Sequence, residues 1–219
     1  MKVLKVHPVK CEAIFSLKKL FHRVNKKNLD LAIKALRQGQ IVIFPTETAY
    51  GLAGNPFNPE VIDKIYLIKG REFDKPLPLI ADSFETVEKY FETNEIEKKL
   101  AEKFWPGPLT IVLKYKDDRL GKLNKQGNNI AVRVSSDKLA RDLARSLNGL
   151  IISTSANVSG EPECYNIDTV VKQFDNIEHK PDVVLDFGKL KKQKPSTIIL
   201  IKNKKINILR QGEVNMHTT

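Results

Sequence analysis

Short apolar runs alternate with amphipathic stretches along most of this chain, and the alternation limits what the chain can fold into. The apolar runs are rich in valine and isoleucine, which is typical of buried strands. Several stretches between them carry apolar residues at helical spacing. This pattern predicts an α/β domain (α+β-like) with a single twisted mixed sheet flanked by helices, although it leaves the strand order open. The predicted strands cover residues 41–44, 77–81, 109–115, 130–134, 150–153, 183–185, 197–201 and 205–209.

Capping residues indicate where the predicted helices begin and end. We expect Asp30 to cap the first helix and Gly39 to end it. Asn58 followed by Pro59 opens a second helix, which ends at Gly70. Further helices are predicted after caps at Ser83 and Asn94 and over residues 137–147 and 167–174.

The composition is that of a globular protein. The chain has 219 residues, of which 41% are hydrophobic and 29% charged, enough for one domain with a substantial core. No apolar run approaches the roughly 20 residues of a membrane helix, and no secretory signal is recognisable, so we expect a cytoplasmic protein without a membrane partner. Cys11 and Cys164 form no CxxC pair and the four histidines show no ligand spacing, so no zinc site is expected.

The net charge is +11, from 37 basic and 26 acidic residues. Solvated lysine faces are one explanation of this charge. Attraction to a polyanion such as a nucleotide or an RNA is the other, and it includes a weak contact with tRNA. A protein that reads bases would rely more on arginine and exposed aromatic residues, whereas aromatic residues make up 7% of this chain.

Three polar segments are candidates for a ligand site. FPTETAYGLAGN, residues 44–55, leaves a predicted strand and carries hydroxyls and bare backbone to the edge of the sheet. IKGRE presents Lys69 and Arg71, which suit phosphates. STSANVSG, residues 153–160, offers neutral donors to phosphate, ribose or carboxylate oxygens. The alternatives are an ordinary turn, a helix C-terminus that attracts cations, and a plain loop.

Two arginines in predicted strands are further candidates. Arg133 interrupts the strand IAVRV and Arg210 ends the strand INILR. Such a charge usually faces solvent, but at a cleft it anchors an anion. The chain has no GxxxxGK[ST], GxGxxG or GxSxG motif, so P-loop, Rossmann and hydrolase sites are unsupported. We therefore expect chemistry by positioning and charge neutralisation rather than covalent catalysis.

Taken together, these segments resemble the YrdC family, the threonylcarbamoyl-AMP synthases, in their short single-domain form with an open basic cleft. The resemblance covers about residues 29–214, so we predict an N-terminal strand and basic connector over 1–28, a YrdC-like catalytic domain over 29–214 and a tail over 215–219. The segments that carry it are, in order, FPTETAYGLAGN, IYLIKGREFDKPLPLI, FWPGPLTIVL, IAVRVS, ISTSANVSGEP, PSTIILI and ILRQGEV.

The resemblance implies a nucleotidyl transfer. L-Threonine and bicarbonate give threonylcarbamate, whose carboxylate attacks the α-phosphate of ATP to give threonylcarbamoyl-AMP and pyrophosphate. Mg²⁺ accompanies ATP, no residue of the chain is expected to bind a metal by itself, and threonylcarbamoyl transferase proteins complete the modification of tRNA. Family position makes Lys69 and Arg71 the catalytic residues. It assigns ATP to Lys69, Arg71, Asn129, Ser155, Asn157 and Arg210, and threonine to Thr46, Arg133, Ser153 and Ser196.

The sequence departs from the family pattern at four positions. Many members have His where this chain has Ile80, and Thr where it has Asn129. Pro is common at the positions of Ser135 and Gln211. The change at Ile80 bears on the threonine pocket, whereas the KxR and SxN residues are all present.

Two other functions compete with this interpretation. The first is a non-catalytic RNA-binding module that uses the basic cleft. The second is a carbamoyl-adenylate chemistry that starts from carbamoyl phosphate, as in hydrogenase-maturation proteins that contain a similar domain. Those proteins are much longer and carry zinc-finger and acylphosphatase parts that this chain lacks.

Overall fold

The computed structural model describes residues 1–5, 26–175 and 177–216. Its helices are α1 (Lys26–Arg37), α2 (Pro59–Lys69), α3 (Phe84–Tyr90), α4 (Glu95–Phe104), the 3-10 helix η1 (Asp118–Leu123), α5 (Lys138–Arg145) and α6 (Ile167–Phe174). Its strands are β1 (Lys2–Lys5), β2 (Val42–Pro45), β3 (Tyr50–Gly54), β4 (Leu79–Ala81), β5 (Leu109–Lys114), β6 (Asn129–Val134), β7 (Leu150–Ser155), β8 (Val183–Asp186), β9 (Thr197–Lys202) and β10 (Lys205–Arg210).

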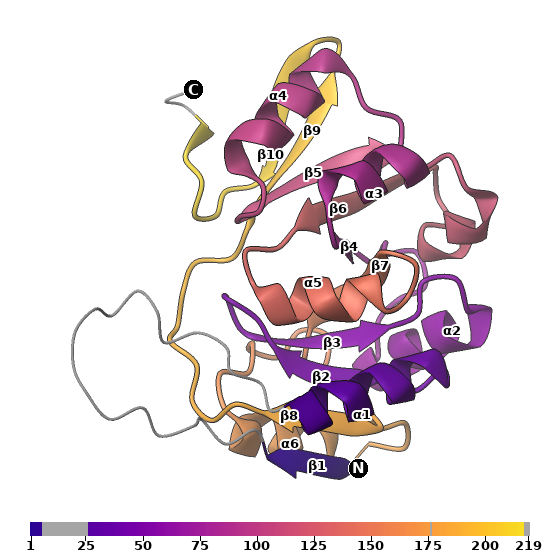
Figure 1. Ribbon diagram of the computed structural model, residues 1–219, viewed down its shortest axis with the longest axis vertical. Helices are drawn as coiled ribbons and strands as arrows, with labels where there is room; N and C mark the ends of the chain where they lie inside the picture. The colour runs from indigo at the N-terminus through magenta and orange to yellow at the C-terminus, as the bar shows by residue number, and fades with distance from the viewer. Residues whose placement is uncertain (6–25, 176, 217–219) are drawn as a thin grey trace.

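The strands form one mixed sheet of ten strands, in the order β1-β8-β2-β3-β7-β4-β6-β5-β9-β10. Figure 1 shows this sheet from β1 at the bottom to the β9–β10 hairpin at the top. The central run from β2 through β3 and β7 to β4 is antiparallel, whereas β4 pairs with β6 in parallel. The predicted α/β class with one mixed sheet flanked by helices is confirmed.

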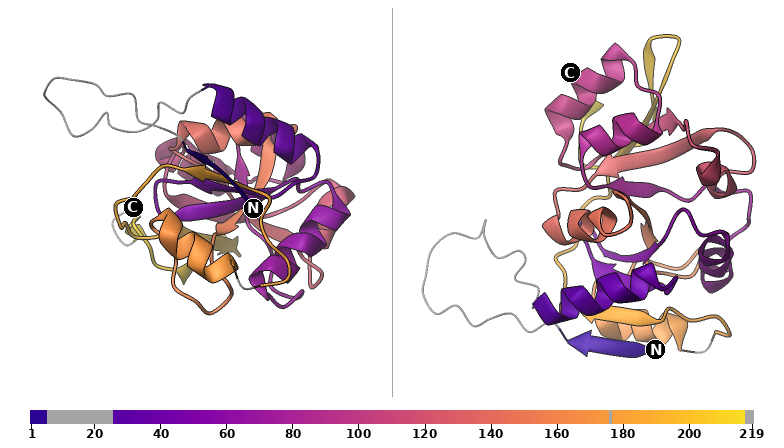
Figure 2. Two further views of the ribbon diagram at one scale, coloured as in Figure 1. Left: turned by 90° about the horizontal axis from the view of Figure 1, so that it is seen from below. Right: turned by 45° about the vertical axis from the view of Figure 1, so that its right-hand side comes forward.

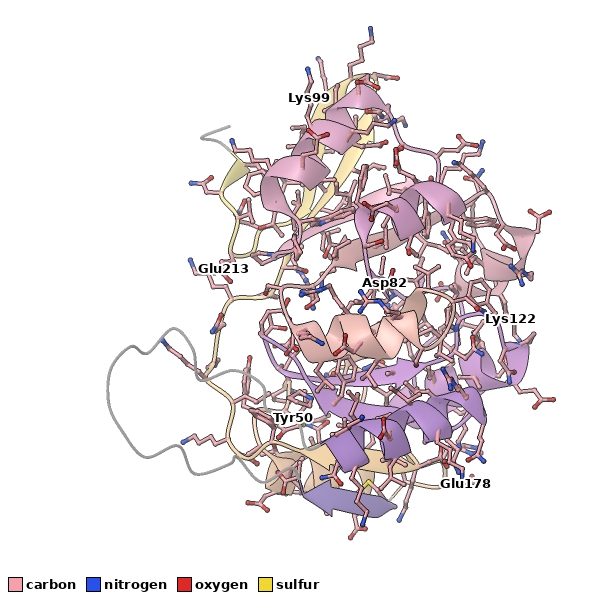
Figure 3. The ribbon with its side chains drawn as sticks, in the orientation of Figure 1. Tyr50, Asp82, Lys99, Lys122, Glu178 and Glu213 are labelled. Atoms are coloured by element: carbon pink, nitrogen blue, oxygen red, sulfur yellow. The ribbon has the colours of Figure 1, made fainter. Side chains whose placement is uncertain are left out.

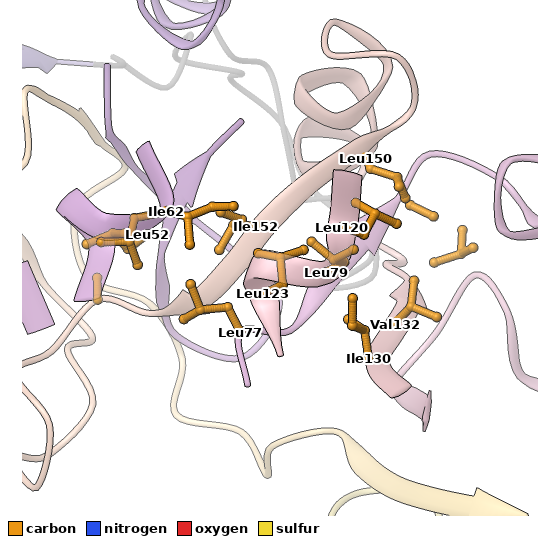
Figure 4. Close-up of a cluster of buried hydrophobic side chains, with 14 of the residues drawn as sticks. Leu52, Ile62, Leu77, Leu79, Leu120, Leu123, Ile130, Val132, Leu150 and Ile152 are labelled. Atoms are coloured by element: carbon orange, nitrogen blue, oxygen red, sulfur yellow. The ribbon is translucent and has the colours of Figure 1, made fainter. Parts of the chain in front are cut away.

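The sheet has an apolar cluster on each face. Viewed from below, α1 and α5 lie on one side of it and α2 and α6 on the other (Figure 2). The larger cluster joins β-strand residues such as Leu79 and Ile152 to α2 and η1 (Figure 4). The smaller cluster joins Ile80 and Ile151 to α1 and α5. Neighbouring residues of one strand thus enter opposite clusters, as the pleat requires.

Most predicted helix ends are confirmed. Asn58 accepts hydrogen bonds from the first backbone N–H groups of α2, and Gly70 ends that helix in the left-handed region at φ 54°. Ser83 and Asn94 cap α3 and α4. The prediction for Asp30 is wrong, because α1 begins at Lys26 and Asp30 lies inside it.

The apolar stripe of α1 explains this difference. Leu29 packs against the smaller cluster together with Ala32 and Leu36, at spacings of three and seven residues. The buried face of the helix therefore starts before Asp30, and burial of that face outweighs the local preference of Asp for a cap.

The turn after Phe44 is shorter than the sequence predicts. The turn covers residues 46–49, and Tyr50–Gly54 then forms the buried strand β3. Gly54 packs closely against α2, since a Cβ on it would lie 2.6 Å from Val61 Cγ1 and 2.8 Å from Ile65 Cδ1. Small residues that were interpreted as a turn thus allow a helix to approach the sheet.

The predicted N-terminal strand is confirmed, since β1 pairs in parallel with β8. The basic connector after it and Cys11 lie in residues 6–25, and the end of the tail lies in residues 217–219, all outside the described residues. The three domain ranges stay a prediction. No helix within the described ranges is long and apolar enough to cross a membrane.

Candidate functional site

A cavity of about 300 Å³ opens beside the β2–β3 turn. Its walls come from that turn, the end of β7, β6, the segment after α2 and the residues around the start of β9. Segments far apart in the sequence therefore meet at one place. Of the predicted site residues, the cavity is lined by Thr46, Arg71, Arg133, Ser153, Ser155, Ser196 and Arg210.

Lys69 lies behind the cavity wall. It is the last residue of α2 and is 2% exposed, and its Nζ donates to Ser155 O at 2.5 Å, Asn157 O at 2.8 Å and Asn157 Oδ1 at 3.3 Å. Burial and the nearby Arg71 lower the pKa of Lys69 to about 7, whereas three acceptors match the three donors of an ammonium group. Lys69 thus remains in the helix and binds the loop after β7.

Asn157 and Asn129 also lie outside the cavity lining. The amide of Asn157 is occupied inside its own loop, where Nδ2 donates to Glu161 O at 2.5 Å. Asn129 is exposed at the start of β6, on the same face of the strand as Ala131 and Arg133. Asn157 is therefore tied to the cavity wall through Lys69, and Asn129 is not brought to the cavity in this structure.

The hydroxyl of Thr46 is used within the β2–β3 turn. Thr46 Oγ1 donates to Ala49 O at 2.6 Å and accepts from the backbone N–H groups of Thr48 and Ala49, each at 3.2 Å. This geometry is that of the structural turn which the sequence left as an alternative. Thr48, which belongs to the candidate segment FPTETAYGLAGN but was assigned no ligand, also lines the cavity, and its hydroxyl lies 3.1 Å from that of Thr46.

Arg133 lines the cavity and is paired. Its Nη1 donates to Glu47 Oε1, and Ser135 Oγ donates to the other oxygen of the same carboxylate at 2.8 Å. The side chains of Arg133 and Glu47 are only 11% and 15% exposed. Burial, together with the nearby Arg210, lowers the pKa of Arg133 to about 10, and Asp137 opposes this shift. The bond to Glu47 favours the charged guanidinium.

Arg210 and Ser196 form a second polar group of the wall. Arg210 donates to Ser196 O through Nε at 3.1 Å and Nη2 at 2.9 Å, and to Ser196 Oγ at 3.0 Å. Ser196 Oγ also lies 2.8 Å from Thr110 Oγ1. Burial lowers the pKa of Arg210, and Glu163 opposes that shift. These contacts fix the start of β9 against the end of β10.

Arg71 lines the cavity from the loop that follows α2. It follows the left-handed Gly70, which turns the chain out of α2. Its Nε donates to Lys75 O at 3.2 Å and its Nη2 to Pro76 O at 3.0 Å. These bonds close the loop after α2 and hold the guanidinium at the cavity.

The sequence prediction missed several lining residues. Thr110 lies in a strand that was predicted from its β-branched residues and given no site role. Glu163 follows the SxN loop, where a single acidic residue forms no motif. The carboxylate of Glu163 accepts from Tyr165 at 2.9 Å. Tyr50, which is labelled in Figure 3, lies in the candidate segment FPTETAYGLAGN and was not missed. Its hydroxyl donates to Gly188 O at 2.8 Å and accepts from Phe187 N at 2.9 Å. Burial raises the pKa of Tyr50.

Ile80 does not face the cavity. It is 1% exposed and packs with Leu139 and Leu143 in the smaller cluster, whereas its neighbour Leu79 lines the cavity. The expectation that Ile80 bears on the threonine pocket is therefore not supported by its position, because alternation along β4 turns the side chain away.

The arrangement is suited to an anionic ligand. Three arginines from separate segments reach one cavity, together with hydroxyls of serine and threonine and one carboxylate. No group of three His, Cys, Asp or Glu side chains that could hold a metal ion occurs in the part of the chain that the structure describes. Cationic groups and neutral donors of this kind bind phosphates and carboxylates.

Comparisons with known proteins identify the family of the chain. The Sua5/YciO/YrdC family model, described as "Telomere recombination", matches residues 34–212. The chain belongs to the Sua5/YciO/YrdC family. The resemblance drawn from the sequence motifs is thereby confirmed.

Two relatives illustrate the similarity within the Sua5/YciO/YrdC family. A Methanocaldococcus jannaschii protein, provisionally named as a threonylcarbamoyl-AMP synthase, is 37% identical over 201 residues, which are 92% of this chain and 93% of that protein. The threonylcarbamoyl-AMP synthase of Vibrio campbellii is 32% identical over 189 residues, 85% of this chain and 100% of its own.

A solved structure of the family extends the similarity to the fold. The crystal structure of P. abyssi Sua5 complexed with L-threonine superimposes with a TM-score of 0.85 at 28% identity. It covers 100% of this chain, which in turn spans 59% of that protein's length.

Proposed function

We propose that this Sua5/YciO/YrdC family member is a threonylcarbamoyl-AMP synthase, a nucleotidyltransferase that uses L-threonine, bicarbonate and ATP. The observation that carries the proposal is the convergence of Arg71, Arg133 and Arg210 on one cavity. A substrate set with a carboxylate, a carbamate and a triphosphate needs several cations at different points of one site. Relatives that carry the synthase name and a relative solved with L-threonine support it.

The proposed chemistry does not require a nucleophilic side chain. The carbamate oxygen of threonylcarbamate attacks the α-phosphorus of ATP, the new O–P bond forms, and the bond from that phosphorus to the bridging oxygen breaks. Pyrophosphate takes the electron pair. A carbamate is already an anion, so the step requires alignment and stabilisation of phosphate charge more than a strong base. Among the described lining residues there is no cysteine or histidine.

Each arginine has a place in this proposal. Arg133 and Ser153, which both line the cavity, would bind threonine, with Arg133 at its carboxylate. Arg71 and Arg210 would face the phosphates and lower the energy of the leaving pyrophosphate. Lys69 would act through the loop of Ser155 and Asn157, because its amine is bound to that loop.

Mg²⁺ would arrive with ATP. Mg²⁺ commonly keeps several waters and is held by substrate phosphates and one or two carboxylates. Glu163 is the carboxylate among the lining residues and fits that limited role. When bound, the ion would neutralise phosphate charge. The onward transfer of the threonylcarbamoyl group to tRNA by transferase proteins belongs to the same proposal.

A product assay tests the function. Purified protein is incubated with ATP, Mg²⁺, bicarbonate and L-threonine, each omitted in turn, and the products are identified by mass spectrometry. We expect threonylcarbamoyl-AMP and pyrophosphate only when all three substrates are present. Folded protein that binds ATP but gives no such product would overturn the proposal. RNA binding that falls steeply with salt would then favour the RNA-binding module.

A further inference from the structure

A carboxylate outside the cavity lining holds the arginine that lines it. Glu47 lies in the β2–β3 turn, and Arg133 lies near the end of β6. Strands β7 and β4 separate β3 from β6 in the sheet, so the ion pair reaches across two strands. Arg133 lines the cavity and Glu47 does not. The carboxylate therefore binds the guanidinium without filling the space where a ligand would sit.

Glu47 is itself held by a second residue. Its Oε2 accepts from Ser135 Oγ at 2.8 Å, and the same hydroxyl oxygen accepts from the backbone N–H of Asp137 at 3.1 Å. Ser135 is fully buried, and its carbonyl accepts from Arg141 Nη1. These bonds fix the backbone around Ser135. Because the hydroxyl oxygen already accepts from Asp137 N–H, its own proton is donated to Glu47.

This arrangement has a consequence for ligand binding. A free arginine side chain loses rotamer freedom when it binds a carboxylate, and that loss opposes binding. Arg133 has already lost that freedom, because one side of its guanidinium is bound and its side chain is 11% exposed. Its remaining N–H donors are available for a bidentate bond with a ligand carboxylate.

We propose that Glu47 is a positioning residue that orients Arg133 toward the carboxylate of the amino-acid substrate, and that Ser135 keeps Glu47 in place. The proposal rests on the proposed function, in which Arg133 binds the carboxylate of L-threonine. Glu47 acts through Arg133 and does not touch substrate.

The test compares KM values in the product assay. Glu47→Gln keeps the size and an acceptor but loses the charge. We expect it to raise the KM for L-threonine about tenfold, the size of one charge-assisted hydrogen bond, with the KM for ATP unchanged. Ser135→Ala should raise the KM for L-threonine by a smaller factor. Glu178→Gln, at an exposed position outside the cavity lining (Figure 3), is the matched control. It should change neither the KM for L-threonine nor the KM for ATP.

A double-mutant cycle with Arg133→Gln separates positioning from a general structural effect. If Glu47 acts through Arg133, the Glu47→Gln change should add little to the KM increase that Arg133→Gln causes alone. Independent, multiplicative effects, or an equal rise in the KM for ATP, would overturn the proposal. If thermal unfolding shows that Glu47→Gln is not folded, Ser135→Ala and its double-mutant cycle with Arg133→Gln provide the same test.

The outcomes also distinguish this inference from the proposed function. If Arg133→Gln leaves the KM for L-threonine unchanged, the carboxylate does not bind there and the assignment of Arg133 is wrong. If Arg133→Gln raises that KM and neither Glu47→Gln nor Ser135→Ala does, only the positioning role fails.

Discussion

The side-chain amine of Lys69 donates to the backbone carbonyl of Ser155 at 2.5 Å, and this bond joins the C-terminal end of α2 to the end of β7. Two more bonds from the same amine reach Asn157. The two signatures of the sequence, KxR and SxN, are therefore one structural unit. Lys69 and the SxN loop support the wall from which Ser155 and Arg71 face the cavity.

Replacing Lys69 by methionine tests this unit. Lys69→Met keeps an unbranched apolar stem but leaves two buried carbonyls without their donor. We expect the free energy of unfolding to fall by about 3 kcal/mol and ATP affinity to fall with the displaced loop. Urea unfolding and calorimetric ATP titration measure the two effects. A variant with unchanged stability would show that the three bonds do not hold the loop.

The low pKa of Lys69 predicts a pH dependence of stability. Its pKa is about 7 when folded and 10.5 ordinarily, so between these values the unfolded chain binds more protons at this site. The contribution of Lys69 to unfolding free energy should rise with pH through this window, by up to about 1.4 kcal/mol per pH unit.

Urea unfolding of wild type and Lys69→Met at pH 7, 8 and 9 checks this dependence. The stability of the wild type relative to the variant should increase at each step. A constant difference would mean that the three acceptors keep the ammonium charged throughout.

Arg71 is predicted to stabilise the phosphates of ATP while contributing little to the stability of the fold. Arg71→Ala removes a guanidinium whose protein contacts are two carbonyls of an exposed loop. We expect kcat for adenylate formation to fall at least 100-fold, the typical effect of losing one group that stabilises transition-state charge, with the unfolding temperature nearly unchanged. Arg119→Ala, at an exposed arginine on η1, is the matched control. Full activity of Arg71→Ala would refute its assignment.

Ile80→His introduces the residue that the family pattern led us to expect at this position, and we expect it to be harmful here. The ring would enter the apolar cluster of Leu139 and Leu143, and burying a polar imidazole among apolar side chains is unfavourable. The unfolding free energy should fall by about 2 kcal/mol, while the KM for L-threonine stays the same. Ile80→Val is the volume control. A lower KM for L-threonine in Ile80→His would show that the side chain reaches the cavity.

Gly54→Ala should destabilise the protein through packing. The added Cβ would lie 2.6 Å from Val61 Cγ1 and 2.8 Å from Ile65 Cδ1, so α2 must move away from β3. We expect a loss of about 1–3 kcal/mol, the usual effect of overpacking a core. Gly127→Ala, where the nearest heavy atom is 3.8 Å from the new Cβ, is the control. Equal unfolding temperatures for the two variants would contradict the close contact.

Much of the secondary structure could be predicted because it depends on neighbours in the chain. The helix from Asn58 to Gly70 has its cap, apolar face and stop signal within a dozen residues, and all three are present in the structure. Asp30 and β3 were misjudged for a related reason: local preferences favoured a cap and a turn, and burial against distant elements decided otherwise.

The candidate site was predictable in its residue types but not in its contacts. Arg71 was singled out with Lys69 at the end of a helix, and Arg133 and Arg210 as lone arginines in predicted strands. All three line the cavity. Nothing near Arg133 in the sequence indicates Glu47, 86 residues away, as its partner. Glu163 and Thr110 carry no pattern of their own, so only their place in the fold reveals them.

The sequence by itself determined the class of the fold, most helix ends, the family and the main cationic residues of the site. Periodicity, caps and motifs depend on residues that lie close together in the sequence. Only the tertiary structure decided the strand order, the burial of Lys69, the face that Ile80 presents and the pairing of Arg133 with Glu47. These features depend on which distant segments pack together, and that choice is made by the burial of whole faces of the sheet.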